Sequence, residues 1–305
     1  MLRAEPGTNM QRLLISTRAE SECHEIARRL RGASAVWNGG RPPREPFAEG
    51  FDAVAFPSPN ADTPAELALG VRAGKHLLLV DPWQVPEEAV TWMFTQARAA
   101  GVRFVVANYD RYWPSRRLIH QELVAGKLGR PGLVRIHRWW QLALDDSRLG
   151  QRLPPGLSRD LDLAIWLAGA RPDVAYACGD IANVGAYLQV HLGFDGGGMA
   201  LIDYCTRLPE DSRGYQSLHV IGSSGAAYCD EQQQVQLSFG GGLPRAVIGR
   251  DSYVVPSIVQ DFVDDTPAEA SLAMSYAQWQ HVRAAAEAVR QSLATRKAVR
   301  VEAVA

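Results

Sequence analysis

Three short stretches of this sequence carry side chains that could bind a ligand or move a proton. The first is the turn 16–21 (STRAES), between an apolar run and a helical pattern. Backbone N–H groups at a helix start hold a phosphate when glycines let the ligand come close. This turn has no glycine. Its Arg18 could meet a phosphate, whereas Glu20 and Glu22 would oppose one while supporting the helix dipole.

The other two stretches contain Asp81 and Arg159. Asp81 stands between the apolar run 76–80 and Pro82. Its carboxylate either stabilises an Asx-type turn or faces a ligand at the carboxyl end of a strand, where open α/β sheets bind their ligands. Arg159 is either a surface charge that pairs with a neighbouring aspartate such as Asp160, or an anion-binding group. Because arginine stays protonated at neutral pH, it cannot serve as a general base.

The elements that must position these residues alternate along the first third of the chain. Apolar runs predict strands at 12–16, 34–37, 52–56, 76–80 and 102–107, and helical patterns lie at 20–31, 63–73 and 86–100. Nearly continuous apolar strands that alternate with helices are typical of a parallel sheet covered on both faces. The sequence therefore predicts a shortened Rossmann-type α/β domain over residues 1–115.

Two helix starts carry capping signals. Thr63-Pro64-Ala65-Glu66 combines a capping residue, a proline at the first helical position and a glutamate three residues on. Thr17 and Glu20 have the same spacing. We expect Thr63 to be a helix cap rather than a ligand contact.

Residues 116–305 follow a different pattern and predict a second domain of α+β type. Strands or hairpins are expected at 133–140, 186–205, 218–229 and 235–239, with helices near 115–125, 160–167 and 268–293. Strands that mostly follow one another favour an antiparallel sheet with helices on one face. Trp139 and Trp140 point to opposite faces of one strand, so that one is core or interface and the other could line a sugar site.

Composition excludes several classes of function. The chain has 32 basic and 33 acidic residues, a formal net charge of −1, which gives no electrostatic reason to expect nucleic acid or an anionic membrane as partner. No apolar run approaches the roughly 20 residues that span a bilayer, and the N-terminal residues lack the apolar segment of a signal peptide. The four cysteines lie far apart and the seven histidines form no ligand pattern. We therefore expect no metal site and a cytoplasmic location.

Several segments together resemble the Gfo/Idh/MocA family of glucose–fructose oxidoreductase, inositol dehydrogenase and their relatives. They include the strand 52–56 with the Pro59-Asn60 that follows, the stretch 73–76 (AGKH) with its strand and Pro82, and the segment 108–114 (NYDRYWP). The hairpin 194–204 (FDGGGMALIDY) is similar to the C-terminal domain of that family. The resemblance covers most of the chain and implies NAD(P)-dependent oxidation or reduction of sugars, polyols and related compounds.

The resemblance also assigns positions to the cofactor and to catalysis. It implies that NAD or NADP would contact Ser16, Thr17, Arg18, Asn38, Pro57, Ser58, Asn60 and Pro82. The family's lysine falls on Asp81 and its acid/base histidine on Arg159, and the two positions would converge from different domains. The family's glycine-rich turn is replaced, no acidic residue follows the second strand, and the segment before residue 52 is too short for the usual helix.

These departures predict a divergent homologue in which family-type hydride transfer is impaired or absent. It would bind a sugar-like or phosphorylated ligand between its domains, or act as a partner protein. The alternative is an active NAD(P)-dependent oxidoreductase in which Asp81, Tyr109 or Tyr112 moves the proton.

The resemblance further implies self-association, because family members commonly pair through the face of the C-terminal sheet that helices leave open. We expect a homo-oligomer there. Trp139 or Trp140, Tyr187 and Tyr204 would supply the apolar area that marks such an interface.

Overall fold

The computed structural model describes residues 12–39, 50–140, 153–179, 187–209, 211–212, 214–230, 235–239, 245–248, 253–266 and 272–302. The chain forms two compact units. Unit 1 contains residues up to Tyr112 and also Tyr253–Tyr276, and unit 2 contains Trp113–Ser252 and Ala277–Ala305. The return of the chain to unit 1 was not foreseen from the sequence, which predicted one division near residue 115.

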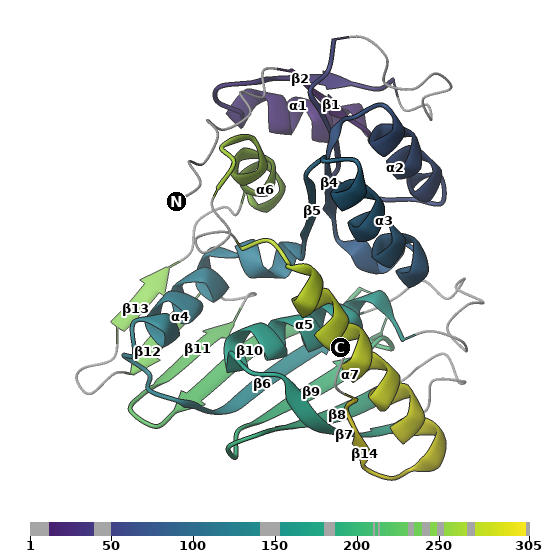
Figure 1. Ribbon diagram of the computed structural model, residues 1–305. Coiled ribbons are helices and arrows are strands. Elements are labelled where there is room, and N and C mark those ends of the chain that lie inside the picture. Colours follow the sequence, from purple (N-terminus) through teal and green to yellow (C-terminus); the bar gives the residue numbers. More distant parts are fainter. Residues whose placement is uncertain are drawn as a thin grey trace, which may run out of the picture. The chain divides into compact units, whose positions relative to one another are not determined.

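Unit 1 is built on a five-stranded parallel sheet in the order β2-β1-β3-β4-β5 (Figure 1). Its strands are β1 (Arg12–Ile15), β2 (Ser34–Trp37), β3 (Ala53–Phe56), β4 (His76–Val80) and β5 (Phe104–Ala107). Leu14 pairs with Val36 on one side and Val54 on the other. Nearly all residues of β1, β3 and β4 are buried, as expected for a parallel sheet covered on both faces. The predicted Rossmann-type sheet is confirmed.

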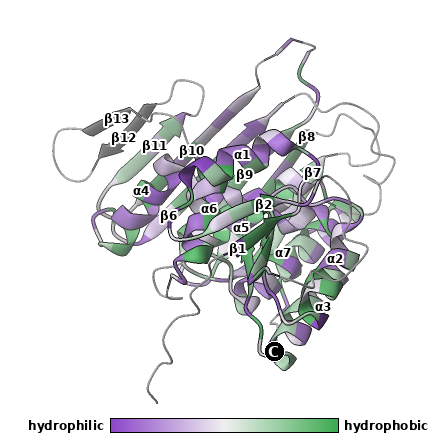
Figure 2. Ribbon diagram, turned by 90° about the horizontal axis from the view of Figure 1, so that it is seen from above, coloured by the Kyte–Doolittle hydropathy of each residue, from purple (hydrophilic) through white to green (hydrophobic). Residues whose placement is uncertain are grey.

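Helices cover this sheet from two parts of the chain. The connecting helices are α1 (Glu20–Arg29), α2 (Thr63–Arg72) and α3 (Glu87–Ala99), with short 3-10 turns η1 (Pro82–Gln84) and η2 (Tyr109–Tyr112). A further helix, α6 (Val254–Val263), packs against α1, β4 and η2. The contrast between hydrophobic β1 and mostly hydrophilic α1, which buries only Cys23 and Ile26, is visible in Figure 2. Thus α6 supplies apolar cover that α1 alone does not provide.

Polar contacts connect the segment Tyr253–Tyr276 to the rest of unit 1. Gln260 accepts a hydrogen bond from the backbone N–H of Arg31 at 2.8 Å. Arg103 forms an ion pair with Asp265 and lies over the ring of Phe262, 4.6 Å from its centroid. These contacts explain why residues 253–276 belong to unit 1 although 140 residues, Trp113–Ser252, separate them from η2.

The predicted capping roles of Thr63 and Thr17 are wrong. Thr63 is the first residue of α2, and its hydroxyl accepts a hydrogen bond from the backbone N–H of Asn60 at 2.9 Å. Glu66 does not turn back to close a capping box, because it bonds to Ser16 instead. In α1 the N-cap is Ala19 without a side-chain cap.

Unit 2 contains a nine-stranded sheet in the order β13-β12-β11-β10-β6-β9-β8-β7-β14. Its strands are β6 (Pro131–Trp139), β7 (Pro172–Gly179), β8 (Tyr187–Phe194), β9 (Met199–Cys205), β10 (Tyr215–Gly222), β11 (Ala226–Asp230), β12 (Val235–Phe239), β13 (Arg245–Ile248) and β14 (Val299–Arg300). Only the pair β6–β9 is parallel among those described. The expectation of a mostly antiparallel sheet is confirmed, although β7 was not predicted.

The helices of unit 2 are α4 (Pro114–Val124), α5 (Pro155–Ala168) and α7 (Tyr276–Thr295). They lie on one side of the sheet (Figure 1), with α5 packed on β6 and β9. Val134, Ile136 and Arg138 of β6 are buried, and the alternate residues of the strand are partly exposed. We call the side of the sheet away from α5 the open face.

Three details of the second half of the chain differ from the predictions. Helix α5 begins at Pro155 rather than at 160, and residues 272–275 precede the final helix rather than form part of it. Residues 268–271 of that predicted helix lie outside the described residues. Tyr204 does not face the open side. It is buried, and its ring would meet a Cβ added to Gly156 of α5 at 3.0 Å, because it alternates with Asp203 along β9.

Candidate functional site

The strand order of unit 1 reverses its direction between β1 and β3. From β1 the chain continues through α1 to β2, on one side, and from β3 through α2 to β4, on the other. Such a reversal is the topological switch point at which open α/β sheets bind ligands. Ser16 directly follows β1, and Pro57 and Ser58 follow β3. Most of the cofactor positions implied by the resemblance therefore gather in one unit at this edge.

A chain of hydrogen bonds connects three side chains beneath the turn after β1. The carboxamide of Asn38 donates to the hydroxyl of Ser16 at 3.0 Å, and that hydroxyl donates to the carboxylate of Glu66 at 2.5 Å. Glu66 is only 3% exposed. Burial raises the pKa of Glu66, Asp62 raises it further, and the hydrogen bond from Ser16 opposes the change. The floor of the site thus contains a carboxyl group whose charged form is disfavoured by burial, and whose sequence spacing had indicated helix capping instead.

A second carboxylate, that of Glu22, ties the start of α1 to the loop after β3. The hydroxyl of Thr17 donates to Glu22 Oε2 at 2.6 Å, and the hydroxyl of Ser58 donates to Glu22 Oε1 at 2.7 Å. The same Thr17 oxygen accepts the backbone N–H of Ala19 at 3.2 Å. Glu22 lies in the first turn of α1, where the helix dipole favours a negative charge. We call Thr17, Glu22 and Ser58 the Glu22 clamp.

The remaining cofactor candidates also have partners within unit 1. Arg18 lies 3.5 Å from Asp62, and both side chains are largely exposed. The indole of Trp37 donates to the carbonyl of Thr17 at 2.9 Å. Asn60 accepts the backbone N–H of Asp62 at 2.8 Å through its side chain. These contacts connect the loops to one another.

Several groups that could bind a phosphate at this edge already have partners within the chain. Such a group needs N–H and O–H donors directed at it and close backbone approach at the helix start. Here the hydroxyls of Thr17 and Ser58 each donate a hydrogen bond to Glu22. A carboxylate of the chain itself therefore accepts from two of the hydrogen-bond donors at this edge. The only described cation of the turn, Arg18, pairs with Asp62. Sequence reasoning noted the missing glycines and the acidic residues, but not the clamp, because it joins residues 36 positions apart.

Asp81 and Tyr109 occupy the ends of the two neighbouring strands. The backbone N–H of Asp81 donates to the carbonyl of Ala107 at 2.8 Å, so β4 and β5 end side by side. Asp81 is 7% exposed and has φ 54° and ψ 66°, a left-handed conformation that non-glycine residues seldom adopt. Its side chain does not cap the η1 turn that Pro82 begins. Strained residues cluster at functional sites, which agrees with the interpretation of Asp81 as a site residue.

The segment after β5 is more buried than sequence reasoning indicated. Asn108, Asp110 and Arg111 are each at most 1% exposed, Tyr112 is 3% exposed and Tyr109 is half-buried. The side chain of Asn108 accepts the backbone N–H of Asp110 at 3.0 Å. Only Tyr109 of this group was a catalytic candidate with an accessible side chain.

Arg159 belongs to unit 2 and lies half-buried on α5. Asp160, one aspartate proposed as its partner, is bound by Arg138, whose Nε lies 2.8 Å from each carboxylate oxygen. Burial, chiefly, and the charge of Asp160 raise the pKa of Tyr204 to about 12. Because Asp81 lies in unit 1, its pairing with Arg159 stays a prediction.

The open face of the sheet in unit 2 carries a second polar cluster, centred on Asp203. Its carboxylate accepts hydrogen bonds from Gln189 at 2.9 Å and Tyr187 at 3.5 Å. Arg135 and His137 lie 3.2 and 3.1 Å from it. Burial lowers the pKa of His137 despite the opposing effect of Asp203, and Arg135 lowers it further. The polar residues of this cluster lie on three different strands, β6, β8 and β9. Their spacing along the sequence therefore does not reveal that they are in contact.

In the same cluster a serine contacts a histidine, and that histidine contacts an aspartate. Ser217 Oγ lies 2.9 Å from His137 Nδ1, and His137 Nε2 lies 3.1 Å from Asp203. Such an order can activate a hydroxyl as a nucleophile. However, Ser217 is 1% exposed, so a substrate cannot reach its hydroxyl, and we assign this arrangement to the structure of the sheet.

No group of three or more histidine, cysteine, aspartate and glutamate side chains in the described ranges is placed to hold a metal ion. Within those ranges, too, no helix has both the length and the apolar character needed to cross a membrane.

Comparison with known proteins supports the fold. No family model and no curated protein matches the chain. Solved structures match over nearly its whole length. A putative myo-inositol dehydrogenase from Sinorhizobium meliloti is 18% identical, with a TM-score of 0.76 over 96% of this chain and 100% of that one. An oxidoreductase from Agrobacterium radiobacter, in complex with NAD+, L-tartaric acid and magnesium, is 16% identical, with a TM-score of 0.75 over 96% and 99% of the two chains.

A UDP-N-acetylglucosamine 3-dehydrogenase from Acidithiobacillus ferrooxidans is 17% identical, with a TM-score of 0.75 over 94% of this chain and 98% of that one. The chain therefore has the two-domain fold of the Gfo/Idh/MocA-type oxidoreductases. Identities of this size establish the fold and leave the activity of this chain to its own residues.

Proposed function

We propose that this chain is a protein of the Gfo/Idh/MocA fold that has lost family-type hydride transfer and binds a sugar-like or phosphorylated small molecule, or acts as a partner protein, without a dinucleotide. The observation that carries the proposal is the Glu22 clamp. It joins the two loops of the switch point through a carboxylate, at the edge where the resemblance to the family implies a nicotinamide cofactor.

The negative charge of Glu22 is expected to repel a phosphate group at this edge. A phosphate charge about 5 Å from the Glu22 carboxylate would be repelled by about 3 kcal/mol at an effective dielectric constant near 20. That repulsion corresponds to a loss of more than a hundredfold in affinity, since 1.4 kcal/mol is a factor of ten. Movement of Glu22 out of the way would relieve it, but would break the hydrogen bonds to Thr17 and Ser58.

The catalytic positions support the same proposal. By resemblance, the acid/base histidine is replaced by Arg159, whose guanidinium cannot accept the proton of a substrate hydroxyl. The position of the lysine carries Asp81, which reverses the charge there.

Steady-state turnover tests this proposal. The unmodified protein, Asp81→Lys and Arg159→His are each assayed with NAD+ and NADP+ against a panel of sugars and polyols, and with NADH and NADPH against aldoses and ketoses. We expect no turnover above the blank for any of them. Asp81→Lys alone supplies no base, so it is not expected to restore activity. Robust turnover of one sugar by the unmodified protein would overturn the proposal.

One observation favours a second candidate function, an active NAD(P)-dependent oxidoreductase. Asp81 and Tyr109 end neighbouring strands at the ligand-binding edge, and the strained backbone of Asp81 is typical of a functional residue. Either group could then move a proton. Trp37 offers a discriminating signal because its indole contacts the turn after β1. Quenching of the tryptophan fluorescence by micromolar NADH, absent in Trp37→Phe, would favour this second function.

We also propose that the chain forms a homo-oligomer through the open face of unit 2. Large apolar side chains are exposed there on four strands: Tyr176, Tyr187, Met199 and Ile221. Concentrated apolar surface of this kind usually marks an interface.

A further inference from the structure

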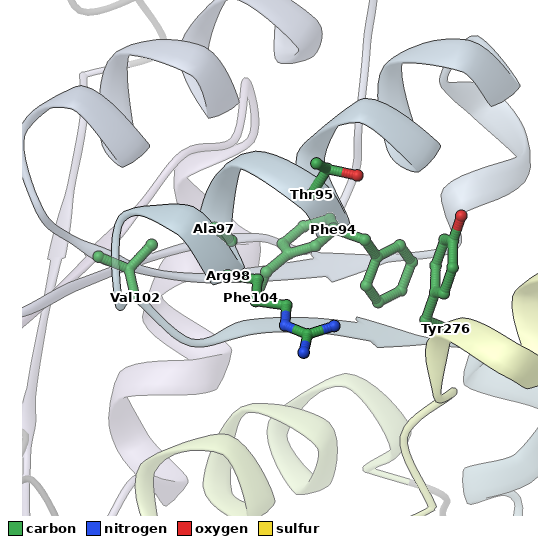
Figure 3. Close-up of a pocket in the computed structure, with 7 residues that line it drawn as sticks. All are labelled: Phe94, Thr95, Ala97, Arg98, Val102, Phe104 and Tyr276. Carbon is green, nitrogen blue, oxygen red and sulfur yellow. The ribbon is translucent and has the colours of Figure 1, made fainter.

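A pocket of 360 Å³ lies in unit 1 between α3, the start of β5 and Tyr276 (Figure 3). Phe94 and Arg98 of α3 line it, together with Phe104, the first residue of β5, and Tyr276. Because the candidate site lies at the carboxyl ends of the strands and Phe104 begins its strand, the pocket is a separate feature.

Three aromatic rings form the apolar wall of the pocket. The ring of Phe94 lies between the other two (Figure 3), 5.0 Å from the centroid of Phe104 and 5.2 Å from that of Tyr276. Tyr276 is 43% exposed, and Phe94 and Phe104 are half-buried. Tyr276 is held in place because Met274, two residues earlier, pairs with Val106 of β5 through a backbone hydrogen bond of 2.7 Å. The wall is thus preformed, and its rings are not fully buried by the chain.

One charged group, Arg98, completes the lining. Its side chain is exposed, and in the described part of the chain it forms no hydrogen bond or ion pair. Arg98 stands in the last turn of α3, where a cation also interacts favourably with the helix dipole. Arg72 also stands in the last turn of its helix, α2, and lines no part of this pocket. A substitution of Arg72 therefore serves as a control, because it removes the same interaction with a helix dipole without changing the pocket.

We propose that this pocket binds a small aromatic carboxylate, with its ring against Phe94 and Tyr276 and its carboxylate toward Arg98. The volume is at the lower end of the range for small-molecule sites, about 300–1,000 Å³, and suits one ring with a short side chain. A guanidinium group recognises a carboxylate by geometry as well as by charge. A dinucleotide or a protein segment needs more space and more polar partners than this lining offers.

Binding of phenylacetate, measured by ligand-observed NMR titration of the full chain, tests the proposal. Phenylacetamide is the neutral probe of the same shape. An exposed ion pair is worth up to about 1 kcal/mol, so phenylacetate should bind about three- to fivefold more tightly. The difference should shrink as salt screens the charge. Arg98→Gln should abolish the difference and Arg72→Gln should retain it.

The aromatic wall is tested separately by Tyr276→Ala. Because Tyr276 is 43% exposed, this variant is expected to fold, and its circular dichroism and melting curve verify that. It should weaken the binding of both probes at least threefold. Equal affinity for the two probes, a difference that survives Arg98→Gln, or no binding of either probe at millimolar concentration would overturn the proposal.

Discussion

Replacement of Glu22 by alanine is the perturbation that the structure of the candidate site constrains most closely. The substitution removes the carboxylate that accepts hydrogen bonds from Thr17 and Ser58 at 2.6 and 2.7 Å. It also removes a negative charge from the first turn of α1. We expect Glu22→Ala to destabilise unit 1 and to loosen the two loops of the switch point.

The size of the effect follows from these contacts. Each hydrogen bond contributes about 0.5–1.5 kcal/mol net, and a carboxylate in the first turn about 0.3–1 kcal/mol. Glu22 is half-exposed, which places the expected loss toward the lower end of the sum, at about 1–2 kcal/mol. In a domain of this size that loss lowers the melting temperature by about 3–6 °C.

Thermal and urea melts of four variants provide the assay. Glu22→Ala, Ser58→Ala and their double mutant form a cycle, in which a direct contact should give a coupling energy of about 0.5 kcal/mol or more. Glu25→Ala is the matched control, because Glu25 is an exposed carboxylate on the same helix beyond the clamp. Its effect should stay within about 0.5 kcal/mol. Equal melting points for Glu22→Ala and Glu25→Ala, with no coupling to Ser58, would refute the clamp.

Three further outcomes follow. Burial raises the pKa of Glu66, so the folded chain binds that proton more tightly than the unfolded chain, and stability should fall as pH rises from about 4.3 through the folded pKa. Glu66→Gln should lose this fall and melt above the unmodified protein at pH 7. An equal gap below about pH 4.3 and at pH 7 would contradict it. Burial lowers the pKa of His137, so its contribution is complete above about pH 6.5 and is lost as pH falls through the folded pKa. Melts of His137→Gln should show a smaller acid loss than those of the unmodified protein. Ile221→Glu on the open face should yield monomers in light scattering at tens of micromolar protein, whereas Val124→Glu, on exposed α4, should not.

The parallel sheet of unit 1 was predictable because its strands are nearly continuous apolar runs. β2 and β4 were predicted to the residue, and the ends of β1, β3 and β5 differ by one or two positions. Helix α6 was missed because its contribution depends on a distant partner. Its hydrophobic residues cover a face of a sheet that lies some 200 residues earlier in the chain, and only tertiary packing assigns them to unit 1.

The candidate site was only partly predictable for the same reason. The absence of glycine after β1 and the acidic residues of α1 can be seen in the sequence, and both indicate a poor phosphate site. The partner of each carboxylate cannot be seen there. Glu66 has the spacing of a capping box with Thr63, yet it bonds to Ser16, 50 residues away, because burial beneath the turn after β1 places the two together. Local spacing shows which partners a side chain can reach within its own helix. The packing around the sheet determines which partner it contacts in the folded chain.

The affinity of the chain for NAD+, NADH, NADP+ and NADPH, measured by isothermal titration calorimetry, tests the central claim most directly. We expect no dissociation constant tighter than about 100 μM for the unmodified protein, because a phosphate at the switch point meets the Glu22 carboxylate. Glu22→Ala should bind more tightly than the unmodified protein, whereas Glu25→Ala should not. A dissociation constant of about 1 μM or below for any of the four nucleotides, worth roughly 8 kcal/mol, would contradict the claim that this chain has lost the dinucleotide site.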